Sequence, residues 1–152
     1  MTAAESTVLL VEDNATDVLL IRRAFDKARL GNPLHVLGDG DAAVEYLSGS
    51  ARYADREQFP LPILILLDLK LPRRSGLEVL EWLRGQASLR RIPVVMLTSS
   101  EQPRDVNSAY DSGVNSYLVK PVEFDALFDM LKAVSLYWVM FNTKPHLGNG
   151  ER

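Results

Sequence analysis

Five side chains able to take part in acid, metal or phosphate chemistry lie at or just after the ends of short apolar runs. Two acids follow the run 7–11 and a third follows 63–67, while a threonine closes the run that begins at 93 and a lysine follows 116–119. These residues are Glu12, Asp13, Asp68, Thr98 and Lys120. Short apolar runs of this kind are typical of strands buried on both faces of a parallel sheet. Ligands of such sheets bind outside the carboxyl ends of the strands, so we expect these side chains to share one site.

The chemistry that such a site favours is phosphoryl acceptance. Three carboxylates in one pocket would repel one another and raise one another's pKa unless a cation were present. Ligands that are all oxygen favour Mg²⁺ over zinc. Lys120 supplies a charge for a phosphoryl oxygen and Thr98 a hydroxyl donor. A carboxylate such as Asp68 is a suitable covalent acceptor, and the transfer depends mainly on positioning and charge neutralisation.

Each residue taken alone also has an ordinary structural interpretation. Asp13 could cap a helix, Thr98 could bond to nearby backbone, and Lys120 could be a solvated surface charge. Asp68 is harder to explain in this way because it follows so apolar a run. The joint placement of these groups at successive strand ends favours the functional interpretation.

The elements that would position these residues alternate regularly along the chain. Strands are predicted over 7–11, 34–37, 63–67, 93–97 and 116–119, and helices over 15–29, 42–47, 75–85, 102–112 and 122–141. This alternation predicts an α/β fold, a flavodoxin-like (βα)5 doubly wound sheet of five parallel strands. The usual strand order, 2-1-3-4-5, places the first and third strands side by side.

The chain reads as a single domain over residues 1–141. Residues 48–62 form an inserted loop with one possible helical turn, and 122–141 form an extended last helix. The loop is either functional or a tolerated insertion with Tyr53 and Phe59 packed onto the body. Residues 142–152 are predicted to be a flexible tail. Too few residues follow 141 for a DNA-binding or catalytic module.

Composition excludes several classes of function. The net charge of −3 and a pI near 5.4 argue against binding to nucleic acid. The absence of cysteine excludes disulfides, thiolate zinc sites and cysteine nucleophiles. No segment is long and apolar enough to enter a membrane and no export signal is evident, so we expect a cytoplasmic protein.

Four segments together resemble one family. They are Val-Glu-Asp-Asn at 11–14, Leu-Leu-Asp-Leu-Lys-Leu-Pro-Arg-Arg-Ser-Gly at 66–76, Leu-Thr-Ser at 97–99 and Tyr-Leu-Val-Lys-Pro at 117–121. Over residues 6–140 the chain resembles the receiver domains of two-component response regulators, which are CheY-like. The resemblance implies that a sensor histidine kinase phosphorylates Asp68 in a Mg²⁺-dependent reaction.

The same resemblance assigns further roles. It implies that Asp13, Asp68 and the backbone carbonyl of Lys70 bind Mg²⁺, with Glu12 helping through water. It implies that Thr98 and Lys120 contact the phosphoryl group and that the Lys120–Pro121 bond is cis. In the implied switch Thr98 moves toward the phosphoryl group and Tyr117 turns inward; alternatively, Tyr117 is a static, half-buried ring.

Two features depart from a minimal receiver. The 48–62 insertion and the aromatic ending at 136–141 resemble stand-alone regulators that partner phytochrome-type kinases. A helix carrying Tyr137, Trp138 and Phe141 beside other apolar residues cannot bury all of them, and exposed aromatic patches mark interfaces. We therefore expect a homodimer through this helix, with Tyr117 on the same output surface. In the alternative, the end folds back onto the sheet.

The sequence predicts a phosphoacceptor switch that signals through protein contacts and has no effector domain. Its expected partners are the kinase and either a downstream protein or a phosphotransfer protein. The only reactions expected are its own phosphorylation and dephosphorylation. Two alternatives are a receiver-like scaffold that acts without phosphorylation and a haloacid-dehalogenase-type phosphatase. The phosphatase would need an acid two residues after its nucleophile, where Lys70 stands.

Overall fold

The computed structural model describes residues 7–147, which form one five-stranded parallel sheet in the order β2-β1-β3-β4-β5. The predicted strand order and fold class are confirmed. The strands are β1 (Val8–Val11), β2 (Leu34–Leu37), β3 (Leu64–Leu67), β4 (Val94–Thr98) and β5 (Ser116–Val119). The helices are α1 (Ala15–Lys27), α2 (Gly40–Ser48), α3 (Gly76–Arg84), α4 (Pro103–Asp111) and α5 (Phe124–Ser135).

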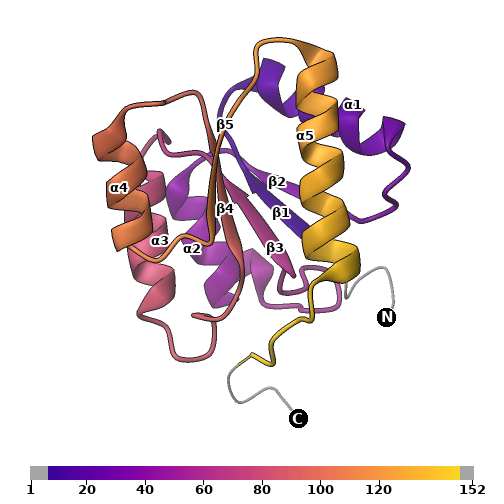
Figure 1. Ribbon diagram of the computed structural model, residues 1–152. Coiled ribbons are helices and arrows are strands. Elements are labelled where there is room, and N and C mark those ends of the chain that lie inside the picture. Colours follow the sequence, from indigo (N-terminus) through magenta and orange to yellow (C-terminus); the bar gives the residue numbers. More distant parts are fainter. Residues whose placement is uncertain (1–6, 148–152) are drawn as a thin grey trace.

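The sheet separates two apolar clusters. Helices α1 and α5 cover one face, and α2, α3 and α4 lie on the other (Figure 1). The central strands β1, β3 and β4 are buried along their whole length, which explains their continuous apolar sequences. Val11 pairs with both Leu37 and Leu67, so β1 and β3 end at the same level of the sheet.

Local side chains set the starts of the helices. The Asn14 side chain accepts a hydrogen bond from the Asp17 amide at 2.9 Å and caps α1. Ser75 and Glu78 form a capping box at α3. The predicted start of α2 at residue 42 is wrong, because Asp39 caps that helix by accepting from the Ala42 amide at 2.7 Å.

The 48–62 insertion is packed into the protein body. It contains the short 3₁₀ helix η2 (Ala51–Tyr53), and Tyr53 is buried. The ring centroids of Tyr53 and Phe59 lie 5.1 Å apart, and both rings contact Tyr46. Arg56 donates hydrogen bonds to the carbonyls of Tyr46 and Leu47 at the end of α2. These contacts favour the interpretation of the segment as an insertion tucked onto the body.

The chain continues after α5 as the π-helical segment η3 (Leu136–Phe141). Beyond it, Lys144 Nζ donates to the Val139 carbonyl at 2.7 Å, and Arg91 donates to the His146 carbonyl at 3.2 Å. Leu147 packs against the cluster that includes α2 and α3. Lys144, His146 and Leu147 thus contact the domain, the flexibility of the tail stays a prediction, and 148–152 lie outside the described residues. Within the described part of the chain, no helix could cross a membrane.

Candidate functional site

Three acids meet at the carboxyl ends of β1 and β3, as the strand order requires. One carboxylate oxygen from each of Glu12, Asp13 and Asp68 lies within 4.8 Å of the other two. Glu12 and Asp68 are only 2% and 8% exposed, whereas Asp13 is open to solvent. The predicted acidic cluster is therefore present, with two buried members and one accessible member.

Lys120 brings an ammonium group to these acids from the end of β5. Its Nζ lies 2.5 Å from Glu12 Oε1, 2.9 Å from Asp17 Oδ2 and 3.2 Å from Asp68 Oδ2. The Lys120 amide donates to the Thr98 carbonyl at 2.7 Å, which fixes the backbone of the lysine against β4. Thr98 is itself buried and pairs with Val119, so the end of β4 lies beside the strand end from which Lys120 continues.

Asp17 is a member of the site that sequence reasoning missed. It lies in the first turn of α1, four residues after Asp13, and reaches the same ammonium as Glu12 and Asp68. The available signal was its place in the first turn of the helix that begins directly after Glu12 and Asp13, because that turn lies near the strand end that carries the two acids.

The prediction of a cis bond before Pro121 is wrong, because the structure has no cis peptide bond among its described residues. The physical reason is that Lys120 needs no unusual bond to reach the acids. Its amide is held by Thr98, and its ammonium reaches three carboxylates from a trans backbone.

Burial and charge shift the ionisation of this group in opposite ways. Burial raises the pKa of Glu12 to about 7, although the hydrogen bond from Lys120 opposes the rise. Burial would lower the pKa of Lys120, but its hydrogen bonds to Glu12 and Asp17 outweigh that effect and raise the pKa above its usual range. One ammonium facing four acids leaves the pocket short of positive charge.

The acidic cluster fits a divalent cation. Its donors are all oxygens, the set that Mg²⁺ and Mn²⁺ favour. The exposed Asp13 and the buried Asp68 could bind the ion, with the Lys70 carbonyl as a third ligand and Glu12 acting through water. The Lys70 amide donates to Asp68 Oδ1 at 3.4 Å, so the backbone at Lys70 already turns toward the acceptor.

Tyr117 and Ser100 connect this site to α4. The Tyr117 hydroxyl donates to the Ser100 carbonyl at 2.9 Å, and the Ser100 hydroxyl donates to Asp105 Oδ2 at 2.5 Å. Tyr117 is half-buried, and burial raises the pKa of its phenol. The ring is thus placed between the loop after Thr98 and the first turn of α4, and its switching role stays a prediction.

Two glycines allow the loop after Asp68 to pack closely. A Cβ at Gly76 would lie 2.1 Å from the Asp68 carbonyl oxygen, and a Cβ at Gly40 would lie 1.9 Å from the Arg74 carbonyl oxygen. The Gly76 amide donates to the Leu69 carbonyl at 2.8 Å. The segment that carries Asp68 and Lys70 therefore depends on backbone contacts that no side chain could share.

The affinity for Mg²⁺ should rise as pH increases through 7. Glu12 must ionise before the acidic cluster carries its full negative charge. We therefore expect the Mg²⁺ affinity to rise about tenfold between about pH 6 and pH 8. The same raised pKa affects the stability of the metal-free protein. Because the folded state binds the Glu12 proton more tightly than the unfolded state does, the free energy of unfolding should fall as the pH rises from 4.5 to about 7. Calorimetric titration checks the first effect, and Glu12→Gln should flatten it; an equal pH dependence in that variant would assign the effect to another group.

Comparisons with known proteins agree with this geometry. The family model described as "Response regulator receiver domain" matches residues 8–132. The "Probable methanogenesis regulatory protein FilR2" of Methanothrix harundinacea is 41% identical over 91% of this chain and 86% of its own length. "Response regulator Rcp1" of Synechocystis sp. is 38% identical over 91% of this chain and 92% of its own length.

Solved structures match equally well. The Mn²⁺-bound form of Rcp1 has a TM-score of 0.83 with 38% identity, covering 92% of this chain and 99% of that one. The phosphorylated cyanobacterial phytochrome response regulator RcpA has a TM-score of 0.86 with 35% identity, covering 93% of this chain and 99% of that one. With its sheet order, its acidic cluster and its lysine all in agreement, the chain belongs to the response regulator receiver domain family.

Proposed function

We propose that this protein is a response regulator in which Asp68 accepts a phosphoryl group from the phosphohistidine of a sensor histidine kinase. The observation that supports this best is the buried Asp68 carboxylate, which belongs to the acidic cluster and lies 3.2 Å from the Lys120 ammonium. Receiver domains are signalling switches, and the RcpA structure carries a phosphorylated relative of this chain.

In the proposed reaction an Asp68 carboxylate oxygen attacks phosphorus. A P–O bond forms, the P–N bond to the histidine breaks, and the departing imidazole takes a proton from solvent. Bound Mg²⁺ supplies positive charge to the phosphoryl oxygens. Lys120 pairs with one phosphoryl oxygen, and the Thr98 hydroxyl donates to another. The carboxylate nucleophile needs no general base.

The surface beside Lys120 suits a donor domain. An apolar groove lies between α1 and the start of α5, lined by Leu20, Ile21 and Leu127 with Lys120 at one end. Val122 next to it is fully exposed. A phosphohistidine must come within bonding distance of Asp68, so its domain has to dock at this edge. The phytochrome response regulators among the relatives support a kinase of the phytochrome type.

Phosphorylation by a small donor tests the proposal. Incubation with acetyl phosphate and Mg²⁺ should add the mass of one phosphoryl group to the wild-type chain and none to Asp68→Asn. Asp129→Asn, which changes an exposed acid of α5, is the matched control and should be modified normally. An unmodified wild-type chain would favour the scaffold alternative. Turnover of a phosphomonoester that depends on Asp68 would favour the phosphatase alternative.

Lys70 and Ser100 should set the lifetime of the phosphoryl group. Both line the open pocket beside the acceptor, through which an attacking water must pass. We expect Lys70→Ala and Ser100→Ala to change the dephosphorylation rate several-fold while leaving the circular dichroism spectrum unchanged. Loss of the phosphoryl mass over time measures the rate. Lys132→Ala on α5 is the control, and the idea is wrong if all three variants decay at the wild-type rate.

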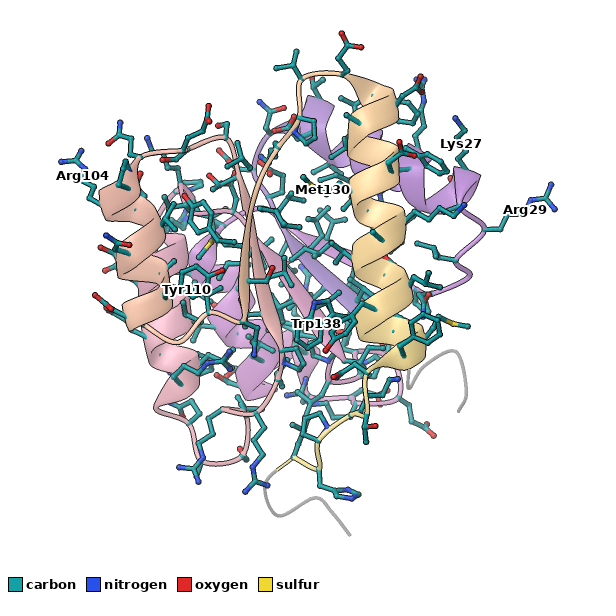
Figure 2. All side chains as sticks on the ribbon, in the orientation of Figure 1. Lys27, Arg29, Arg104, Tyr110, Met130 and Trp138 are labelled. Atoms are coloured by element: carbon teal, nitrogen blue, oxygen red, sulfur yellow. The ribbon has the colours of Figure 1, made fainter. Side chains whose placement is uncertain are left out.

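We further propose a homodimer through η3. Tyr137, Met140 and Phe141 are exposed, with Phe141 at 71%, while Val139 is buried. Trp138 packs against the cluster under α5, and Figure 2 shows its ring turned from the end of that helix toward the sheet. Only part of the aromatic ending thus folds back, and the remaining apolar side chains suit a second copy of this chain.

Replacing the exposed side chains tests the dimer. The double variant Met140→Glu/Phe141→Glu should be monomeric by light scattering at concentrations at which the wild type is dimeric, because it places charge in the apolar contact. Leu19→Glu changes an exposed leucine on α1 and should leave the assembly intact. A monomeric wild type, before and after phosphorylation, would contradict the dimer.

A further inference from the structure

We propose that Asp17 is a positioning residue that holds the Lys120 ammonium in the resting state and must release it when Asp68 carries a phosphoryl group. Asp17 would then oppose phosphorylation and shorten the time that the protein spends in its phosphorylated state. This inference rests on the function proposed above and adds a restraint that none of the expected ligand roles supplies.

A lysine ammonium has three N–H groups and no acceptor. In the structure three carboxylate oxygens lie within hydrogen-bond distance of Nζ, at 2.5 Å from Glu12, 2.9 Å from Asp17 and 3.2 Å from Asp68. Every donor of Lys120 is therefore in use before any phosphoryl group arrives.

The three carboxylate partners of Lys120 differ in how much each would lose without the ammonium. The Glu12 side chain is 1% exposed, so losing the ammonium would leave a buried carboxylate without its hydrogen bond. The Asp68 side chain is the group that would carry the phosphoryl oxygens. The Asp17 side chain is 34% exposed, and water can replace the lysine there at small cost. The Asp17 contact is thus the one that a phosphoryl oxygen displaces.

The Asp17 side chain can be substituted without disturbing the start of α1. The cap of that helix is the hydrogen bond from the Asp17 backbone amide to the Asn14 side chain, and it does not use the Asp17 carboxylate. A side-chain substitution therefore removes the restraint on Lys120 and leaves the cap in place.

Binding of beryllofluoride, which mimics a phosphoryl group on a carboxylate, tests the proposal. At saturating Mg²⁺, Asp17→Asn should bind beryllofluoride roughly 2- to 5-fold more tightly than the wild type, the range expected for losing one partly exposed ion pair. Affinity for Mg²⁺ alone should not increase, because the substitution removes a negative charge from the pocket. Asp17→Ser should behave in the same way, and fluorine NMR or calorimetry measures each affinity.

A matched control separates this effect from simple loss of negative charge. Glu123 is an exposed acid three residues after Lys120, and its side chain makes no hydrogen bond to the ammonium. Glu123→Gln should change beryllofluoride affinity less than Asp17→Asn does. Equal effects in the two variants, or weaker binding by Asp17→Asn, overturn the role of Asp17. A wild-type chain that binds no beryllofluoride with Mg²⁺ overturns the proposed function itself, and the inference with it.

Discussion

Lys120→Met should lower the rate of phosphoryl uptake from acetyl phosphate by about 100-fold or more, the loss that follows removal of one well-placed electrostatic donor from an enzyme active site. The ammonium is the cation nearest to Asp68 among the described residues. The carboxylates of Glu12 and Asp17 hold it in place beside Asp68. Methionine preserves much of the side-chain length while removing the charge. Mass spectrometry of the phosphorylated chain over time gives the rate.

The same substitution should strengthen Mg²⁺ binding. Glu12 and Asp68 bind the ammonium and also belong to the acidic cluster, so a bound metal would be repelled by the nearby ammonium. Removing the ammonium should therefore raise the Mg²⁺ affinity when measured at a pH well above the Glu12 pKa of about 7. Lys132→Met removes a positive charge from α5, away from the site, and should alter neither quantity. Phosphoryl uptake at the wild-type rate in Lys120→Met would contradict the assigned role of the lysine.

The features that the sequence predicted correctly are those that depend on position along a strand. Glu12, Asp68 and Lys120 each follow an apolar run, and in a parallel sheet that fact alone brings them to one edge. The chain order of the elements then leaves few topologies, which is why the order of the strands could be predicted. Propensity and periodicity placed the helix ends to within a few residues, as is usual for boundaries.

The features that were missed depend on how separate elements pack. Asp17 and Lys120 are 103 positions apart, and their contact depends on how α1 lies across the sheet. Gly40 is needed because the start of α2 meets the backbone of Arg74, a contact between a helix and a distant loop that no local pattern reports. Leu147 likewise lies in a polar segment, and only the folded chain shows that it reaches the cluster beside α2 and α3.

Gly76→Ala should lower the free energy of unfolding by about 2–3 kcal/mol, because the new methyl group would overlap the backbone that carries the phosphoryl acceptor. Its Cβ would lie 2.1 Å from the Asp68 carbonyl oxygen and 2.9 Å from the Leu69 Cα. These are backbone atoms and cannot turn aside as a flexible side chain would. The loop must move, and Asp68 and Lys70 must move with it, so phosphoryl uptake should fall together with stability.

Gly85→Ala is the matched control for this prediction. Gly85 follows α3 at φ −84°, and the nearest atom to the new Cβ would be the Trp82 carbonyl oxygen at 3.4 Å, which is ordinary contact. That variant should be neutral or more stable by a few tenths of a kcal/mol, since alanine restricts the unfolded chain. Urea unfolding of the two variants measures the difference. If Gly76→Ala loses no more stability than Gly85→Ala, the loop after Asp68 can accommodate the extra methyl group. Close backbone packing at Gly76 would then not be what holds the acceptor in place.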